Sequence, residues 1–179
     1  ILKENRYFYF WSWEPQFMLE LLTHAVQNGI ESTFSDQLSW QCLKRFIQKK
    51  NGPVPLLSIS ILGPFTISSA GKLVLRTEDF TPAQRTLLSL LLTSPGQQMD
   101  QEAVQLELWP DSAPDKARAK FDTLLVRLRK VMSTQQLEVP VKHYLVMRKG
   151  ILSLKNCCID AVEFGELARL GLKHAHAER

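Results

Sequence analysis

The spacing of apolar residues divides the chain into a helical N-terminal part and a mixed part that follows it. Residues 14–29 carry apolar side chains at helical spacing, and Glu14 and Pro15 suit the start of a helix. A second helical pattern runs from Ser35 to about Lys49, and its apolar residues are predicted to face inward. The apolar positions are Phe17, Met18, Leu21, Leu22, Ala25 and Val26 in the first pattern and Leu38, Cys42, Leu43, Phe46 and Ile47 in the second.

Residues 49–55, KKNGPVP, interrupt both helix and strand patterns with a glycine and two prolines. They predict a linker and a domain boundary. The period then changes to short apolar runs at Leu57–Leu62, Phe65–Ser68 and Leu73–Arg76, which are separated by Gly-Pro and Ala-Gly turns. These runs predict a small antiparallel meander.

Three helices are predicted after the meander. The first begins at TPAQ, residues 81–84, where a capping box is combined with a proline at the first helical position. A short second helix follows Asp100 and ends at Trp109. DKARAKFDTLLVRLRKVM, residues 115–132, predicts a longer third helix for which Ser112 is a candidate N-cap.

The last part of the chain predicts a hairpin and a final helix. HYLVMRKGILSLK, residues 143–155, has two apolar strands and a glycine that can supply the positive φ of a tight turn. Asp160 and Glu163 have the spacing of a capping box for a helix that runs to about His174. Helix capping explains why both carboxylates are present, so acid-base catalysis is not needed to explain them. His174 and His176 form an H-x-H pair, which without further ligands indicates a frayed tail rather than a metal site.

The predicted helix at residues 115–132 has two faces of different chemistry. At about 100° per residue, its apolar side chains fall in one arc of about 120° that is expected to face the core. The arc consists of Ala117, Phe121, Leu124, Leu125, Leu128 and Val131. The polar surface is bordered on one side by Lys116, Lys120, Thr123, Arg127 and Lys130 and on the other by Arg118 and Arg129. Ala119 and Val126 lie between the two borders, with Asp122 nearby.

This concentration of positive charge distinguishes the helix from an ordinary solvated one. Lys116–Lys130 contains six basic residues and one acidic residue, a net charge of +5 against +4 for the whole chain. A solvated helix face usually mixes both signs as i, i+4 pairs. Lys and Arg can reach the phosphates on both sides of a major groove, while small side chains between them allow a close approach to base edges. The pattern therefore favours a helix that lies in the major groove of DNA over a bland amphipathic helix.

Composition and motifs exclude several classes of protein. A chain of 179 residues with 45% hydrophobic content can bury a core, and a pI near 9.0 permits a polyanionic partner. The three cysteines are odd in number and lack C-x2-C spacing, which indicates neither disulfides nor zinc and leads us to expect a cytoplasmic protein. No apolar run approaches the roughly 18 residues of a membrane span. Walker A, G-x-G-x-x-G, H-E-x-x-H and nucleophile-elbow patterns are also absent, so we expect no enzyme activity, cofactor or metal.

Several motifs resemble those of bacterial transcriptional regulators. VRLRKVM is similar to the end of the recognition helix in OmpR/PhoB-type DNA-binding domains. LGPFTI, TPAQRTLLSLLLTSPGQQMDQEAVQLELWPD, KARAKFDTLLVRLRK and CIDAVEFGEL resemble SARP-type transcriptional activators from Leu56 to about Leu170. FWSWEPQFMLELLTHAVQNGIE and CLKRFIQKK resemble the end of the helical repeat region in large MalT-like regulators, so we expect the chain to be part of a larger protein. Asp122 departs from the family pattern, where a polar or basic residue is common, and leaves the preferred DNA sequence open.

The elements and the resemblance together predict an α+β fold. Its core is a winged helix-turn-helix with an N-terminal antiparallel sheet and a C-terminal β-hairpin wing, preceded by a small all-α segment. The predicted domains are residues 1–52, the end of a helical repeat region; residues 53–158, the winged-helix DNA-binding domain; and residues 159–179, the first helix of a following activation domain.

The predicted function is sequence-specific binding of double-stranded DNA by a transcriptional activator, with residues 115–132 in the major groove and residues 143–155 as the wing. The residues predicted to contact DNA are Lys116, Arg118, Lys120, Thr123, Arg127, Lys130, Arg148 and Lys149. The first three are expected nearest the bases, because recognition helices present their N-terminal half to the groove, and the last four are expected mainly at phosphates. RNA polymerase and a second copy of the chain on DNA are the other expected partners. The alternative is a protein-interaction module whose basic helix docks on an acidic partner surface.

Overall fold

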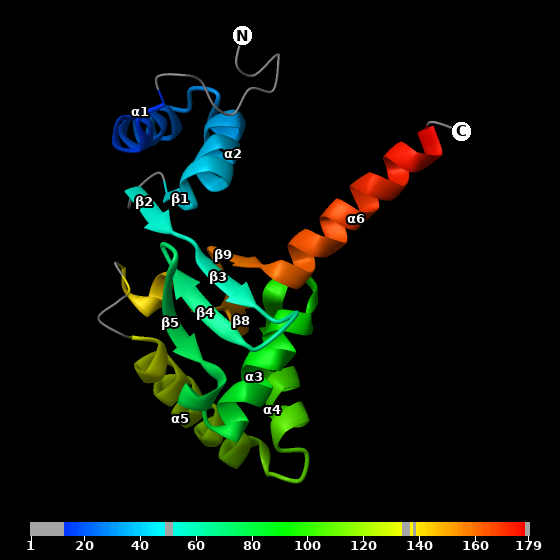
Figure 1. Ribbon diagram of the computed structural model, residues 1–179. Helices are drawn as coiled ribbons and strands as arrows, with labels where there is room; N and C mark the ends of the chain where they lie inside the picture. The colour runs from blue at the N-terminus through cyan, green and yellow to red at the C-terminus, as the bar shows by residue number, and fades with distance from the viewer. Residues whose placement is uncertain (1–12, 49–51, 134–136, 138, 178–179) are drawn as a thin grey trace. The chain divides into compact units, whose positions relative to one another are not determined.

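The computed structural model describes residues 13–48, 52–133, 137 and 139–177 (Figure 1). The chain divides into two compact units, Ile1–Leu56 and Leu57–Arg179. The sequence predicts the first domain boundary after residue 52, whereas the first compact unit of the structure continues to Leu56. Within the described ranges, none of the helices is both long enough and apolar enough to span a membrane.

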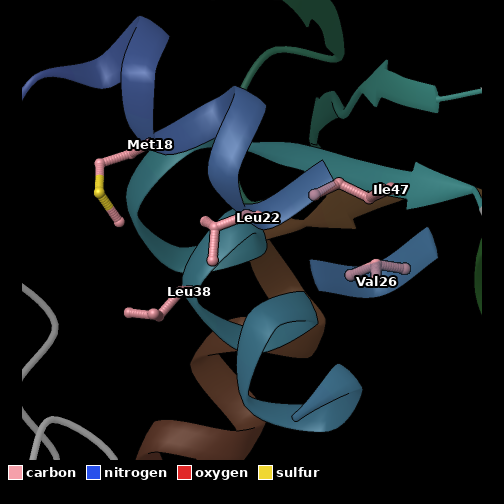
Figure 2. Packing of buried hydrophobic residues seen from close by; sticks show 5 residues of the cluster. All are labelled: Met18, Leu22, Val26, Leu38 and Ile47. Carbon is pink, nitrogen blue, oxygen red and sulfur yellow. The ribbon is translucent and has the colours of Figure 1, made fainter. Parts of the chain in front are cut away.

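The first unit contains two helices followed by a hairpin. Its elements are α1 (Pro15–Gln27), α2 (Ser32–Leu43), β1 (Arg45–Gln48) and β2 (Gly52–Pro55). α1 begins as predicted, because the Glu14 carboxylate accepts hydrogen bonds from the backbone N–H groups of Gln16 and Phe17. Met18, Leu22 and Val26 then form a buried cluster with Leu38 of α2 and Ile47 of β1 (Figure 2). Phe17 and Leu21, which belong to the same apolar pattern, are exposed.

The second helix differs from its prediction. It ends at Leu43 rather than near Lys49, because Lys44 adopts a left-handed conformation with φ of 51°. The following Arg45–Gln48 segment forms β1, which pairs antiparallel with β2, Gly52–Pro55. The prediction of a linker is therefore wrong for Gly52–Pro55, and the first unit is not all-α.

The second unit begins with the predicted meander. Strands β3, β4 and β5 are antiparallel neighbours, and β9 joins the edge of the sheet parallel to β3, giving the order β5-β4-β3-β9. β9 was not predicted from the sequence. The strands are β3 (Leu57–Ser60), β4 (Thr66–Ser69), β5 (Lys72–Arg76) and β9 (Cys157–Ile159).

Three helices that pack on one another follow the meander, as predicted, and the predicted hairpin is part of a three-stranded second sheet whose strand β6 was not predicted. The capping box at the start of α3 is confirmed by a hydrogen bond of 2.9 Å from the Thr81 N–H to Gln84 Oε1. The second sheet has the order β6-β8-β7, and its β7–β8 hairpin is the predicted wing. The elements are α3 (Pro82–Thr93), β6 (Gln98–Asp100), α4 (Gln101–Leu108), α5 (Pro114–Met132), β7 (Leu145–Arg148), β8 (Ile151–Leu154) and α6 (Asp160–Ala177), with short 3-10 helices η1 (Thr77–Asp79), η2 (Pro95–Gln97) and η3 (Val141–His143). The α+β class with a winged-helix arrangement is thus confirmed.

Apolar side chains from the helices and the second sheet form the core of this unit. All of the following are fully buried: Leu87 and Leu91 of α3, Val104 of α4, Phe121 and Leu128 of α5, Tyr144, Leu145 of β7 and Leu152 of β8. The three helices and the hairpin therefore form one packed body. Figure 1 shows α3, α4 and α5 beside the meander.

Asp160 joins the start of α6 to the end of β3. Its carboxylate accepts hydrogen bonds from the Ser60 Oγ–H at 2.6 Å and from the backbone N–H groups of Ile61 at 2.9 Å, Leu62 at 3.1 Å and Ala161 at 2.8 Å. Desolvation by burial raises the pKa of this carboxyl, but the four hydrogen bonds together outweigh it and hold the pKa below its ordinary value of 3.8. The charged form therefore stabilises the junction between the meander and α6.

The first testable prediction concerns Asp160→Asn. We expect it to lower the free energy of unfolding at neutral pH by about 1 kcal/mol, because the amide has one acceptor oxygen and no charge where the carboxylate accepts four hydrogen bonds. Because the folded-state pKa is depressed, the stabilisation is fully present above pH 3.8 and is lost as the pH falls through the lower folded-state value. Thermal unfolding of parent and variant should therefore converge under acidic conditions. Faster amide hydrogen exchange at Ile61 and Leu62 in the variant would locate the effect.

The control for this prediction is Asp122→Asn, which removes the same charge from an exposed position on α5. It should leave the amide exchange of Ile61 and Leu62 unchanged. The interpretation is wrong if Asp160→Asn and Asp122→Asn show the same exchange rates and the same dependence of thermal stability on pH.

Candidate nucleic-acid interface

The basic segment forms one continuous helix, α5, from Pro114 to Met132. Pro114 occupies the first turn, Asp115 lies near the positive end of the helix dipole, and Arg129 and Lys130 lie in the last turn near the negative end. Ser112 is not the N-cap, which is Ala113. These features explain locally why the segment is helical over its whole length.

The buried side of α5 agrees closely with the predicted arc. Its buried residues are Ala117, Phe121, Leu124, Leu125, Leu128 and Met132. Val131 was placed in this arc by its angle but is only half-buried, and Met132 is buried in its place. The opposite side of the helix therefore faces solvent.

All eight residues predicted to contact DNA are exposed. Six lie on α5: Lys116, Arg118, Lys120, Thr123, Arg127 and Lys130. Arg148 and Lys149 lie at the tip of the β7–β8 hairpin. The strip between the basic borders of α5 is exposed as well, and Val126 within it has an exposed fraction of 65%.

Lys120 is held by neighbours outside its own helix. Its Nζ donates a hydrogen bond of 2.9 Å to Ser112 Oγ and lies 6.0 Å from the centre of the Trp109 ring. Ser112 therefore orients a cation instead of capping the helix. Trp109, directly after α4, is half-buried and contributes its ring to this surface.

One border of α5 is hollowed into a pocket of about 490 Å³. Its lining combines the start of α3, the α4–α5 loop and α5, and it brings together three of the predicted contact residues. The lining residues are Thr81, Ala83, Trp109, Ala119, Lys120, Thr123, Leu124 and Arg127. Arg118 is not among them, in agreement with its predicted place on the opposite border.

Arg129 contacts the hairpin and is not fully exposed. It is half-buried, and its Nη2 donates a hydrogen bond of 3.4 Å to the backbone oxygen of Leu145 in β7. Its Nε is buried without a hydrogen-bond partner among the described residues. No ion pair within the described ranges joins Asp122 to Arg118 or Arg129, so the carboxylate of Asp122 remains on the exposed surface.

The tip of the hairpin is a tight turn with two left-handed residues. Lys149 has φ of 50° and Gly150 has φ of 78°, between the paired Arg148 and Ile151. Two positive φ angles are typical of a type I′ turn, in which Asn-Gly is the preferred pair and lysine is disfavoured at the first position. The Gly150 carbonyl accepts a hydrogen bond of 2.7 Å from the N–H of Gln101, the first residue of α4. The tip is thus attached to the helical body.

Two contacts that organise this surface could not be identified from the sequence, those of Ser112 with Lys120 and of Gln101 with Gly150. Both depend on where loops and helices meet in the folded chain. Ser112 could be singled out in the sequence, because a hydroxyl directly before a helix is conspicuous, but its position indicated a helix cap. No feature of the sequence distinguished Gln101.

The described part of the unit offers neither a cluster of metal-binding side chains nor an activated thiol at Cys157. No group of three or more His, Cys, Asp or Glu side chains within it could hold a metal ion. Burial raises the pKa of the Cys157 thiol to about 11, although the nearby Lys155 charge and a backbone hydrogen bond lower it somewhat. This thiol stays protonated at neutral pH and is a poor nucleophile.

The chain matches no family model, and no curated protein matches it. Among solved structures it is similar to Mycobacterium tuberculosis EmbR in complex with a low-affinity phosphopeptide, with 24% sequence identity and a TM-score of 0.43. The similarity covers 56% of this chain and 26% of that chain.

The contrast between the two sides of α5 gives a second prediction. Leu128→Ala should lower the free energy of unfolding by about 2 to 5 kcal/mol, because it leaves a cavity among fully buried neighbours. Arg127→Ala, one residue earlier on the exposed side, should change it by less than about 0.5 kcal/mol. Urea unfolding followed by circular dichroism measures both. Equal effects of the two substitutions would mean that α5 is rotated differently about its axis.

Proposed function

We propose that the second unit binds double-stranded DNA sequence-specifically as part of a transcriptional regulator. In this proposal α5 lies in the major groove and the β7–β8 hairpin is the wing. The observation that carries it is the sidedness of α5, which has a fully packed apolar face and an opposite exposed face bordered by basic side chains. The role is one of binding and not of catalysis.

The arrangement of charge supports DNA as the ligand. Lys116, Lys120 and Arg127 lie on one border of the exposed face and Arg118 on the other, so both phosphate walls of a groove are within reach of cations. The small side chains between the borders allow the helix backbone to approach the base edges. Arg148 and Lys149 add two cations at a tip that is attached to the start of α4. A winged-helix domain binds a duplex with its recognition helix and its basic hairpin, while its two other helices support the recognition helix.

A finer assignment follows from the sequence resemblance. We propose an OmpR/PhoB-type domain of a SARP-like activator, which acts on chromosomal DNA in the cytoplasm, contacts RNA polymerase and binds DNA as a pair of copies. In this assignment the first unit is the end of a MalT-like helical repeat region and α6 is the first helix of an activation domain. An acidic protein surface is the second candidate ligand, because the same exposed cations would suit it.

The third prediction separates these ligands. With about five phosphate contacts, the logarithm of the association constant for duplex DNA should fall with the logarithm of salt concentration at a slope of about −4 to −5. The Lys120→Ala, Arg127→Ala double variant should bind less tightly, with a slope shallower by about 1, because one phosphate contact is lost with Arg127 while the loss of Lys120 removes a contact near the bases. Fluorescence anisotropy with a labelled duplex, chosen by selection from random sequences, measures both quantities.

The matched control is the Lys72→Ala, Lys155→Ala double variant. It removes the same charge from exposed positions outside α5 and outside the hairpin tip, on β5 and directly after β8. It should bind like the parent protein. Absence of duplex binding at low salt, or equal weakening by the two double variants, would reject DNA as the specific ligand.

The fourth prediction uses the strained turn to separate stability from binding. Lys149→Asn should raise the free energy of unfolding by up to about 1 kcal/mol, because asparagine adopts a left-handed conformation more readily than lysine. The same variant should bind DNA less tightly and with a salt slope shallower by about 0.9, since one phosphate contact is lost. Thermal unfolding and anisotropy titrations measure the two effects. Lys142→Asn, at an exposed position in η3, is the control.

Greater stability with unchanged DNA affinity would show that Lys149 does not contact the duplex. In that case α5 would bind the duplex without a phosphate contact from Lys149 of the wing. Lower stability would contradict the assignment of the turn.

A further inference from the structure

The pocket beside α5 combines cations with an apolar surface. Its lining contains two basic side chains, Lys120 and Arg127, and no acidic one. Its volume of about 490 Å³ lies within the range of about 300 to 1,000 Å³ that is usual for small-molecule sites. Half of the lining residues are apolar, namely Ala83, Trp109, Ala119 and Leu124. These properties suit an anion that also has an apolar body.

Lys120 is held in place by the neighbouring loop before any ligand binds. Its Nζ donates one hydrogen bond, to Ser112 Oγ at 2.9 Å, and lies 6.0 Å from the centre of the Trp109 ring. An ammonium group has three hydrogens, so Ser112 leaves two of them for a ligand. Because the side chain is already oriented, binding an anion there costs less side-chain entropy than binding at a freely rotating lysine.

The start of α3 adds to the positive potential of the pocket. Thr81 is the N-cap of this helix and Ala83 lies in its first turn, and both line the pocket. The backbone dipoles of an α-helix sum to a partial positive charge at its N-terminus. The charge of a ligand is therefore favoured on the side of the pocket that Lys120, Arg127 and this helix end share.

A phosphate of the DNA backbone accounts for only part of the pocket. A phosphodiester group satisfies the two cations, but it has no apolar surface to cover the Trp109 ring and Leu124. An aromatic ring covers both, because aromatic rings pack favourably against one another and against aliphatic side chains. A ligand with a ring and an anionic group thus matches both parts of the lining.

We propose that this pocket binds a small aromatic anion, and that the bound ligand competes with DNA for Lys120 and Arg127. The anionic group accepts charge-assisted hydrogen bonds from these two side chains, and the ring covers Trp109 and Leu124. An occupied pocket removes two of the proposed DNA contacts, so the ligand acts as a negative regulator. Binding of the ligand is independent of the proposed function, whereas the competition rests on it.

The test uses cinnamate, an aromatic carboxylate, and cinnamamide, its uncharged analogue. Both are titrated into the full chain while amide and indole N–H chemical shifts are followed by NMR. Cinnamate should shift the indole N–H of Trp109 and the amides of Ala83 and Thr123, which line the pocket. Cinnamamide should bind at least about tenfold less tightly, because it cannot accept charge-assisted hydrogen bonds.

Three variants make the test specific. Lys120→Gln should weaken cinnamate binding about tenfold, whereas Lys72→Gln, at an exposed position on β5 outside the lining, should bind like the parent. Ala83→Asp places a negative charge in the pocket and should abolish binding of cinnamate. It should unfold at about the same temperature as the parent, since an acidic residue is favourable in the first turn of a helix. Loss of folding will therefore not imitate loss of binding.

Competition is measured by fluorescence anisotropy with a duplex selected from random sequences, at constant ionic strength. Cinnamate at ten times its dissociation constant should weaken binding of the duplex about tenfold, as expected of two ligands that exclude each other. Cinnamamide at the same concentration should have no such effect.

The outcomes distinguish this inference from the proposed function. No shift at Trp109 or Ala83, equal binding of the two probes, or equal weakening by Lys120→Gln and Lys72→Gln would overturn the site. Cinnamate binding with unchanged affinity for the duplex would overturn the competition. If cinnamate binds and no duplex binds at low salt, the site stands and the proposed function is wrong. If the duplex binds and cinnamate does not, the reverse holds.

Discussion

The burial of one side of α5 is the constraint on which the candidate surface depends. Phe121 and Leu128 are fully buried, and α3, α4 and η3 all pack against this helix. Because a helix repeats every 3.6 residues, its rotation is set once this side is buried, and the opposite strip must face outward. Ala119, Thr123 and Val126 are exposed for the same reason that Leu128 is not. The surface chemistry of the unit is thus a consequence of its core.

A second constraint attaches the hairpin to the same body. β6 leads directly into α4 and pairs with β8, and the Gln101 N–H donates to the carbonyl of Gly150 at the tip. Arg129 of α5 donates to the Leu145 carbonyl on the other strand. The basic tip and α5 are therefore held by one sheet, so one ligand can meet both without a change in the fold. Asn156 extends this body to the meander, because its Nδ2 donates to the His143 carbonyl and its own carbonyl accepts from the Leu57 N–H.

Most of the second unit could be predicted from the sequence because its signals are local. The capping box of Thr81 and Gln84, the turn at Gly150 and the helical period of residues 115–132 all depend on neighbours within a few positions. β1 and β9 could not be predicted in this way, because each is a strand only through pairing with a separate segment, Gly52–Pro55 and β3 respectively. The same difference applies to the candidate surface. Exposure followed from periodicity, whereas the contact of Ser112 with Lys120 depends on how a loop returns to the helix.

Two residues on the candidate surface disagree with the local preferences that govern the rest of it. Lys149 is left-handed at the tip of the hairpin, and Val126 is exposed in the middle of a helix. At other positions of the same elements the sequence follows those preferences, as with Pro114 at the start of α5 and Gly150 in the turn. Chains generally keep unfavourable residues where function requires them, and the gain in stability from asparagine or alanine is available at these two positions. At the tip of the hairpin, a cation is the chemistry that a phosphate contact in the proposed DNA complex would require.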